Sequence, residues 1–269
     1  MVPRKQKSIG VFDSGIGGLT VVRALMSRLP YENITYFGDT ARVPYGNKSA
    51  EVVRQYSMED TQFLIGQHVK MIVVACNTAS AVALDALRTQ FDIPIIGVIA
   101  PGAARAVRVT RQGRIGVIGT LATVASKSYP SEILARNKNL TVVSKACPLF
   151  VPLAEEGWSE HRIAQMVAEE YLVSLRKEHI DTLILGCTHY PILRGVIQRV
   201  LGADVQLVDS GEAASEEVAA LLAEKEMLNP STVLPNHSFF VSDVPQRFRE
   251  LGEIFLGTTQ MRVTKVHIP

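Results

Sequence analysis

The stretch "TLILGCTHYP" at residues 182–191 runs from an apolar, β-favouring segment directly into a thiol, a hydroxyl and an imidazole. An earlier stretch, "MIVVACNTAS" at residues 71–80, has the same construction. Short apolar runs of this kind are typical of strands buried on both faces of a parallel sheet. The two stretches therefore predict two buried strands, one leading into Cys187 and the other into Cys76.

Outward from these stretches, short apolar runs alternate with helical patterns along the whole chain. The alternation begins twice, with "SIGVFDSG" and again with "RIGVIGT", and these two opening strands end at Asp13 and Thr120. Asp13 precedes Cys76, and Thr120 precedes Cys187, by similar intervals. We therefore predict an α/β fold with two similar open, mostly parallel sheet domains that are covered by helices and face each other across a cleft.

Three further predictions concern local structure. A single helix is expected over residues 79–91. The segment "PLFVPLAEEGW" at residues 148–158 reads as a loop, and a helix follows it over residues 159–180. Ser159 is the expected N-cap of that helix, because a serine hydroxyl can accept a bond from a free N–H of the first turn.

The composition is that of an ordinary globular protein of 269 residues, 47% hydrophobic and 20% charged. No apolar run approaches the roughly 20 residues that a transmembrane helix needs. The basic start "MVPRKQKSIG" lacks the apolar stretch of a secretory signal, so a cytoplasmic location is expected. The 28 basic and 26 acidic residues are spread without long runs, so binding of nucleic acid is not expected.

Ligands of open α/β sheets bind outside the carboxyl ends of the strands, so the polar residues at those ends are the candidate site. They are Asp13, Ser14, Asp39, Thr40, Cys76, Asn77, Thr78, Thr120, Thr123, Cys187, Thr188 and His189. If the two domains face each other, Cys76 and Cys187 lie on opposite walls of the cleft.

Two opposed thiols suit the inversion of a carbon centre that carries an acidic hydrogen. One thiolate removes the proton from one face, and a thiol delivers a proton to the other face. A cysteine with a reference pKa of about 8.5 can take either part near neutral pH. Because each cysteine precedes a predicted helix, the N–H groups of that helix are expected to lower the thiol pKa.

The neighbours of the two cysteines have supporting roles in this hypothesis. Asp13 and His189 are expected to tune, or relay protons for, the thiol nearest to each. Short donors beside the cysteines are expected to cap helices or hold a carboxylate, namely Asn77, Thr78 and Thr188. The third cysteine, Cys147, reads as an ordinary buried residue.

Three other functional interpretations of the same residues stay open. Gly15, Gly17 and Gly18 in "FDSGIGG", with Asp39 after the next strand, partly match a dinucleotide-binding fingerprint, but Thr20 stands where the third glycine belongs. A zinc site would need a fourth ligand beyond the two cysteines and His189, and no metal is predicted. A cysteine hydrolase would leave the second cysteine without a role.

Six motifs, in this order along the chain, resemble those of the bacterial glutamate racemases. They are "GVFDSGIGGLTV", "YFGDTARVPYG", "VVACNTAS", "GVIGTLAT", "PLFVPLAEEG" and "LGCTHYP". The resemblance implies a cofactor-independent interconversion of L- and D-glutamate that supplies D-glutamate for peptidoglycan. The wider superfamily includes aspartate and hydantoin racemases, which share the paired cysteines. An aspartate racemase is the alternative, although the aspartate enzymes usually carry an acid where His189 stands.

The resemblance also implies the role of each site residue. Cys76 would deprotonate the D-enantiomer with help from Asp13, and Cys187 the L-enantiomer with help from Glu155 and His189. Further residues would bind the substrate, namely Ser14, Pro44, Tyr45, Gly46, Asn77, Thr78, Thr120, Thr123 and Thr188, together with Asp13 and His189. Glu155 comes from the resemblance alone, because "LAEEGW" by itself reads as an ordinary exposed turn.

The expected domain boundaries follow from the same resemblance. Residues 1–98 with 210–269 would form the first domain, which carries Cys76, and residues 99–209 the second, which carries Cys187. The family resemblance also implies a homodimer with glutamate as its small-molecule partner.

Overall fold

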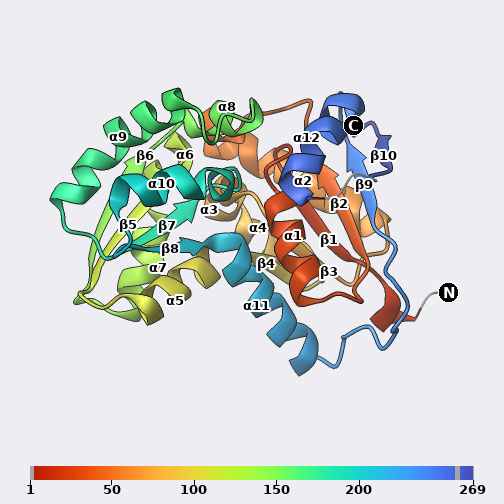
Figure 1. The fold of residues 1–269 in the computed structure, drawn as a ribbon. Coiled ribbons are helices and arrows are strands. Elements are labelled where there is room, and N and C mark those ends of the chain that lie inside the picture. Colours follow the sequence, from red (N-terminus) through yellow and green to blue (C-terminus); the bar gives the residue numbers. More distant parts are fainter. Residues whose placement is uncertain (1–2, 258–260, 269) are drawn as a thin grey trace.

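The computed structural model of the chain describes residues 3–257 and 261–268. In this part of the chain the strands form two parallel sheets, one of six strands and one of four, with helices packed around each (Figure 1). Every pair of neighbouring strands runs parallel. The predicted fold class is confirmed.

The six-stranded sheet combines both ends of the chain. Its strands, in spatial order, are β10 (Val263–Lys265), β9 (Ser238–Val241), β2 (Ile34–Gly38), β1 (Ile9–Asp13), β3 (Met71–Val74) and β4 (Ile95–Gly97). Every residue of β1, β2 and β3 is buried, which is why these strands read as continuous apolar runs rather than alternating ones.

The four-stranded sheet repeats the order of the first sheet. Its strands, in spatial order, are β6 (Thr141–Ala146), β5 (Arg114–Gly119), β7 (Thr182–Gly186) and β8 (Gln206–Asp209). The order β6-β5-β7-β8 corresponds to β2-β1-β3-β4, so β5 matches β1 and β7 matches β3. The register matches Asp13 at the end of β1 with Gly119 at the end of β5, so Thr120 matches Ser14, one residue later than predicted. Cys76 and Cys187 occupy matching positions after β3 and β7. The domain boundaries near residues 98 and 210 stay a prediction.

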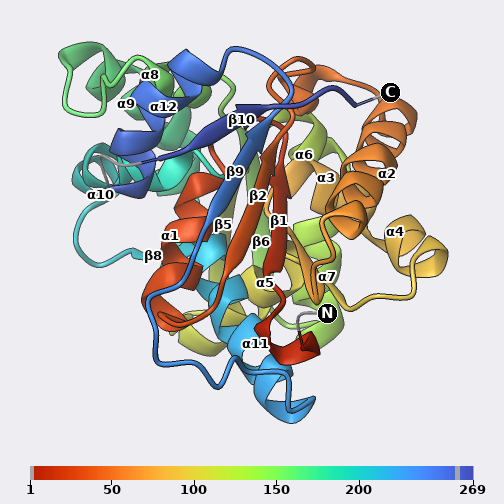
Figure 2. The same ribbon diagram turned by 90° about the vertical axis from the view of Figure 1, so that its right-hand side faces the viewer.

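Helices cover both faces of each sheet. They are α1 (Leu19–Arg28), α2 (Ala50–Gly66), α3 (Asn77–Val82), α4 (Leu84–Gln90), α5 (Ile99–Val109), α6 (Leu121–Ala125), α7 (Ser128–Arg136), α8 (Phe150–Glu155), α9 (Arg162–Lys177), α10 (Arg194–Leu201), α11 (Ser210–Glu224) and α12 (Pro245–Leu256). Short 3-10 turns are η1 (Arg4–Gln6), η2 (Tyr45–Asn47) and η3 (Tyr190–Leu193). In the six-stranded sheet, α1 and α12 lie on one face and α2 and α4 on the other (Figure 2).

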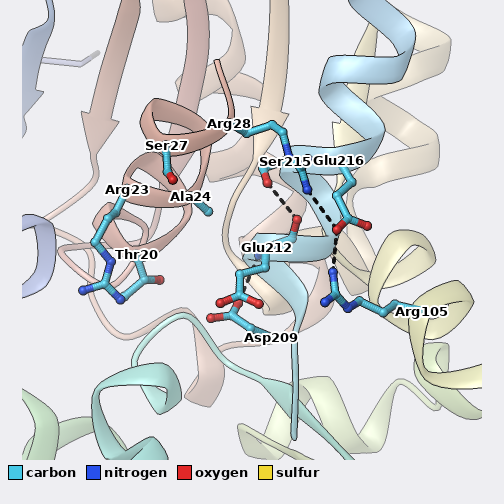
Figure 3. A pocket seen from close by; sticks show the side chains of 10 residues that line it. All are labelled: Thr20, Arg23, Ala24, Ser27, Arg28, Arg105, Asp209, Glu212, Ser215 and Glu216. Carbon is cyan, nitrogen blue, oxygen red and sulfur yellow. Dashed lines mark hydrogen bonds and ion pairs between the residues drawn. The ribbon is translucent and has the colours of Figure 1, made fainter. Parts of the chain in front are cut away.

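One helix, α11, joins the two halves. It packs against α1 beside the first sheet and against α5 beside the second. Its Glu216 accepts hydrogen bonds from Arg28 of α1 at 3.1 Å and from Arg105 of α5 at 2.6 Å (Figure 3). These groups line a surface hollow of about 640 Å³. Because the ion pairs are partly exposed, each contributes only about 0–1 kcal/mol, and the apolar packing of α11 makes the larger contribution.

Three local predictions are wrong. The helix expected over residues 79–91 is interrupted at Ala83, which caps both α3 and α4, and Leu84 at the start of α4 lies beside Gly97 of β4. The predicted loop contains helix α8, which buries Phe150, Leu153 and Ala154. Pro152 does not prevent this helix, because it lies in the first turn, where its missing N–H has no partner in any case.

The third error concerns the start of α9. Its N-cap is His161 rather than Ser159, and the His161 Nδ1 accepts a hydrogen bond from the Ile163 N–H at 3.2 Å. The helix therefore begins later than the serine signal indicated.

Candidate active site

The carboxyl ends of β1 and β3 from one sheet and of β5 and β7 from the other surround a cavity of about 50 Å³. Most of the predicted site residues line it, namely Ser14, Pro44, Tyr45, Gly46, Cys76, Asn77, Thr78, Thr120, Glu155, Cys187, Thr188 and His189. The cavity is thus built from both halves of the chain, with one thiol contributed by each.

Four of the polar residues predicted at strand ends do not line the cavity, namely Asp13, Asp39, Thr40 and Thr123. Asp13 is fully buried at the end of β1, and Thr123 is buried in α6. Three lining residues were not predicted as site residues: Gly15, Val43 and Val151. The two valines carry no chemical signal in the sequence, and only their place in the fold brings them to the cavity.

Cys76 follows β3 and is the N-cap residue of α3, with 6% of its surface exposed. Its Sγ lies 3.8 Å from the Ser14 Oγ. Burial and the Asp13 carboxylate raise the pKa of Cys76 to about 12, against the opposing contacts with the Ala79 N–H and Ser14. The expectation that a helix start lowers this pKa is wrong, because desolvation outweighs the N–H groups of a helix of only six residues.

The Cys187 thiol has a different neighbour. Its Sγ lies 3.8 Å from the His189 Nδ1, and the His189 Nε2 lies 3.0 Å from the Glu155 Oε1. Burial opposes the charged imidazole, but the hydrogen bonds to Cys187 and Glu155 raise the pKa of His189 to about 10. Burial likewise opposes ionisation of Glu155, yet the hydrogen bond to His189 leaves the pKa of this carboxyl lowered.

A protonated His189 therefore stands between an anionic oxygen and the sulfur of Cys187. An imidazolium beside a cysteine favours the thiolate. At β7 the chain enters the 3-10 turn η3 rather than an α-helix directly, so the imidazolium, not a helix start, is the main positive group at this thiol.

Each half contributes hydrogen-bonding groups to the cysteine turn of the other half. Asp13, at the end of β1, accepts a long hydrogen bond from the Thr188 hydroxyl at 3.4 Å. Thr120, which follows β5, has its hydroxyl 2.9 Å from the Thr78 hydroxyl, and the Thr123 hydroxyl lies 3.2 Å from the same group. Residues at the strand ends of each half thus contact the cysteine turn of the other half. Thr120 and Thr123 contact Thr78, which follows Cys76. Asp13 contacts Thr188, which follows Cys187.

The start of α1 adds a second contact across the halves. The buried Thr20 hydroxyl lies 2.8 Å from the Thr188 carbonyl oxygen and 2.9 Å from that of Gly17. A Cβ atom at Gly17 would overlap the side chains of Thr188 and His189, so the chain can approach this closely only because residue 17 has no side chain. The "GIGG" turn is therefore packed against Thr188 and His189 of the other half.

Two predicted binding residues use their side chains inside the protein. The Tyr45 hydroxyl lies 2.9 Å from Asp60 and also contacts Asp39, pointing away from the cavity. The Asn77 side chain accepts a hydrogen bond from the Tyr129 hydroxyl at 2.7 Å and donates to the Ser210 hydroxyl at 3.4 Å. The Tyr45 hydroxyl is therefore already bonded within the protein, although the residue lines the cavity.

Cys147 is fully buried and lies outside the cavity lining. Burial raises the pKa of its thiol to about 12, which fits an unreactive core residue. Within residues 3–257 and 261–268, no group of three or more His, Cys, Asp or Glu side chains is arranged to hold a metal ion. No helix in this part of the chain is long and apolar enough to cross a bilayer.

Known proteins resemble this chain over nearly its whole length. The glutamate racemase of Geobacter metallireducens is 53% identical over 251 residues, which cover 93% of both chains. The glutamate racemase of Neisseria meningitidis is 48% identical over 265 residues, covering 98% of both. A family model described as Asp/Glu/Hydantoin racemase matches residues 22–218.

Solved structures give the same result. The glutamate racemase of Bacillus anthracis superposes with a TM-score of 0.95 at 42% identity, covering 98% of this chain and 99% of the other. That of Francisella tularensis, solved in complex with D-glutamate, has a TM-score of 0.91 at 43% identity and covers 98% of both chains. An aspartate racemase of Picrophilus torridus, at 16% identity and a TM-score of 0.60, shares the fold. The chain therefore belongs to the Asp/Glu/Hydantoin racemase family and, within it, to the glutamate racemases.

Proposed function

We propose that this protein interconverts L- and D-glutamate by proton transfer between the substrate α-carbon and the thiols of Cys76 and Cys187. The observation that carries the proposal is that two thiols from matching strands of two like sheets line one cavity. Similarity to glutamate racemases over nearly the whole chain supports glutamate as the substrate.

The neighbours of the thiols suggest how the protons are distributed at rest. The raised pKa of Cys76 favours its thiol form, and the proposal places the resting thiolate on the other sulfur, that of Cys187, which lies 3.8 Å from the His189 imidazole. This form is ready for L-glutamate: the Cys187 thiolate takes the α-proton, and the Cys76 thiol donates its proton to the opposite face. The products are D-glutamate, a Cys187 thiol and a Cys76 thiolate, which is the form that accepts D-glutamate in the reverse direction.

The remaining site residues have binding and tuning roles in the proposal. Ser14, Thr188 and the hydroxyls of Thr78 and Thr120 would hold the polar groups of glutamate, while Thr123 and the Asn77 side chain would position these groups from behind the cavity. A positioned acid or base contributes about 10²–10⁴-fold to a rate, so the two thiols need further help with so weak a carbon acid. Donors to the substrate carboxylate and the exclusion of water from the cavity would supply it.

Domain movement is part of the proposal. The cavity of about 50 Å³ has room for only a few water molecules, since each needs roughly 10–15 Å³. Cys76 and Cys187 are each only 6% exposed, so residues 1–98 with 210–269 would move apart from residues 99–209 to bring glutamate to the two thiols. Small-angle scattering with and without a tight ligand tests the movement, and identical profiles would count against it.

The deciding experiment for the activity uses L-glutamate in heavy water, without added cofactor. Wild type is expected to exchange the α-hydrogen, followed by NMR, while circular dichroism shows the loss of optical activity. Cys76→Ala is expected to lose racemisation. A folded wild type that exchanges neither L- nor D-glutamate would overturn the assignment, and aspartate would then be tested as the substrate.

Two wider parts of the proposal rest on similarity to the family. The D-glutamate would supply peptidoglycan synthesis, and the active form would be a homodimer. Conditional depletion of the protein, with and without added D-glutamate, tests the first. Sedimentation equilibrium across a range of protein concentrations tests the second.

A further inference from the structure

The segment from residue 39 to residue 46, here called the substrate loop, brings Pro44, Tyr45 and Gly46 to the cavity. It leaves the end of β2 and reaches the other half of the molecule at Thr120. A Cβ atom added to Gly46 would come within 2.7 Å of the Thr120 Cβ, so the two halves already touch at this point. A small displacement of the loop therefore changes the shape of the cavity directly.

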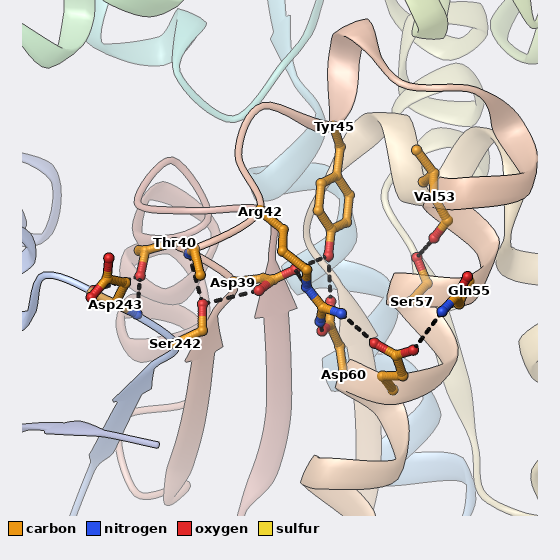
Figure 4. Close-up of polar contacts among 12 residues, drawn as sticks. Asp39, Thr40, Arg42, Tyr45, Val53, Gln55, Ser57, Asp60, Ser242 and Asp243 are labelled. Atoms are coloured by element: carbon orange, nitrogen blue, oxygen red, sulfur yellow. Dashed lines mark hydrogen bonds and ion pairs between the residues drawn. The ribbon is translucent and has the colours of Figure 1, made fainter. Parts of the chain in front are cut away.

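The loop is held from behind by one buried carboxylate. Asp39 accepts hydrogen bonds from the Arg42 Nε at 2.6 Å and from the Ser242 hydroxyl at 3.0 Å, and the Tyr45 hydroxyl also contacts it (Figure 4). Ser242 follows β9 and additionally accepts the Ala41 N–H at 2.8 Å. Two loop side chains and the returning tail of the chain thus converge on Asp39.

Helix α2 holds the other side of the same loop. Arg42 donates to Asp60 at 3.1 Å and to Glu59, and its guanidinium lies 4.1 Å from the centre of the Tyr56 ring. Asp60 is fully buried, and its Oδ2 lies 2.9 Å from the Tyr45 oxygen. The loop is therefore fixed between β2, β9 and α2.

The number of protons between Tyr45, Asp39 and Asp60 decides which of the two carboxyl groups is protonated. The Tyr45 hydroxyl has one proton but lies between two carboxyl groups, those of Asp39 and Asp60. Both contacts are hydrogen bonds only if one carboxyl group is itself protonated. Asp60 is the group that fits, because Asp39 already accepts from two further donors, and because burial and the negative charge of Asp39 raise the pKa of Asp60. Asp60 then donates a hydrogen bond to the Tyr45 hydroxyl, which in turn donates one to Asp39.

We propose that Asp39, protonated Asp60 and the Tyr45 hydroxyl are positioning groups that hold the backbone of the substrate loop in place for substrate binding. In this arrangement the Tyr45 hydroxyl fastens the loop and does not contact the substrate. The kinetic part of this inference rests on the proposed racemase function. A purely structural role predicts loss of stability alone, whereas positioning predicts a specific change in substrate affinity.

The test compares the same substitution at both carboxyl groups. Asp39→Asn replaces an acceptor of three donors with an amide whose nitrogen cannot accept, so it should release the loop. An amide at position 60 can donate to Tyr45 and accept from Arg42, as a protonated acid does. Asp60→Asn should therefore restore what Asp60→Leu loses. Tyr45→Phe should release the loop while preserving the volume of the side chain.

Two readouts separate positioning from stability. Loss of one or two hydrogen bonds is expected to raise KM for both enantiomers by about 5–20-fold in Asp39→Asn, Tyr45→Phe and Asp60→Leu, with kcat changed less than about threefold. In the same variants, hydrogen–deuterium exchange without substrate should quicken in the peptide that contains residues 40–48. The matched control is Ser57→Ala, which removes a buried hydrogen bond to the Val53 carbonyl within α2 but does not touch the loop.

The outcomes are distinct. Raised KM and faster loop exchange in Asp39→Asn and Tyr45→Phe, with Asp60→Asn close to wild type, supports the proposal. Wild-type KM and exchange in Asp39→Asn and Tyr45→Phe overturns it, as does a lowered melting temperature with unchanged kinetics. If Asp60→Asn raises KM and loop exchange as much as Asp60→Leu does, the inference that Asp60 is protonated is wrong. If wild type shows no racemisation, the proposed function fails, and the exchange measurement still decides whether these groups hold the loop.

Discussion

The turns that follow β3 and β7 occupy the same place in two sheets of the same strand order, yet they surround their thiols differently. Cys76 has the Ser14 hydroxyl at 3.8 Å and the Asp13 carboxylate nearby, whereas Cys187 has an imidazole that is backed by Glu155. The fold places the two sulfurs alike, and the neighbours make them unlike. One thiol is kept protonated while the other faces a positive charge.

The same contrast holds one strand further out. Asp39 follows β2 and Cys147 follows β6, so these two residues also occupy matching positions. The segment after Asp39 carries the substrate loop, and the segment after Cys147 forms α8, which ends at Glu155. The two matching segments thus have different parts in the site. The segment after Asp39 carries the substrate loop to the cavity, and the segment after Cys147 brings the Glu155 carboxylate to His189.

The largest expected effect comes from removing either thiol. Cys76→Ala and Cys187→Ala should each lower the rate of glutamate racemisation by about 10²–10⁴-fold, because in the proposed mechanism each removes a group that donates or accepts the α-proton. Circular dichroism of L- and D-glutamate measures the rate. Cys147→Ala is the control and should stay within about threefold of wild type. A rate above one tenth of wild type in either active-site variant would contradict two-thiol catalysis.

A smaller effect should distinguish the two turns. His189→Asn and Asp13→Asn are each expected to lower kcat/KM by about 10–100-fold, since each weakens one proton transfer. Because the enantiomers have equal free energy, kcat/KM must fall equally in both directions.

The difference between these two variants lies in the isotope effect. With α-deuterated substrates, the effect should grow for L-glutamate in His189→Asn and for D-glutamate in Asp13→Asn. The reverse pattern would exchange the roles assigned to the two thiols.

The raised pKa of His189 predicts a dependence of stability on pH. Its ordinary pKa is 6.5 and its folded pKa is about 10, so the charged imidazole stabilises the fold fully below pH 6.5. That contribution is lost as the pH rises to 10. The free energy of unfolding of wild type should exceed that of His189→Asn by on the order of 2 kcal/mol at pH 6, and less at pH 10. Urea unfolding at both pH values measures this, and a constant difference would refute it.

The smallest effect concerns the contact between the halves. Thr20→Val removes the hydroxyl next to the Thr188 carbonyl and should lower the free energy of unfolding by about 1 kcal/mol, the usual contribution of one hydrogen bond. Thr20→Ser keeps the hydroxyl and should lower it less. Equal losses in the two variants, measured by urea unfolding, would show that the methyl group rather than the hydrogen bond stabilises this contact.

Much of this arrangement was predictable from the sequence because it lies at strand ends. The apolar runs before Cys76 and Cys187 predicted both strands, and the rule that ligands bind at the carboxyl ends predicted most of the cavity. The extent to which a side chain is buried is harder to predict from sequence. The shift in the pKa of Cys76, which burial raises, was therefore predicted in the wrong direction. Glu155 required the family resemblance, since nothing in the spacing of the chain reveals that α8 brings it to His189.

The network behind the substrate loop was also beyond sequence reasoning. Asp39 was predicted as a polar residue at a strand end and as a partial match to a ribose-binding acid, whereas its side chain accepts hydrogen bonds from Arg42 and Ser242. Ser242 lies 203 positions from Asp39 in the chain, so their contact follows from tertiary structure and has no local pattern.

The return of β9 to pair with β2 has a consequence for how the protein is made. Ser238 pairs with Thr35, so the six-stranded sheet is incomplete until the residues of β9 have been synthesised, about 200 positions after those of β2. The four-stranded sheet needs only residues 114–209 and can form earlier, since domains tend to fold as units during synthesis. Ser242 reaches Asp39 only at the end of this sequence. The growing chain thus has both thiols long before its substrate loop is fastened, and catalytic competence should be the last property that a newly made molecule acquires.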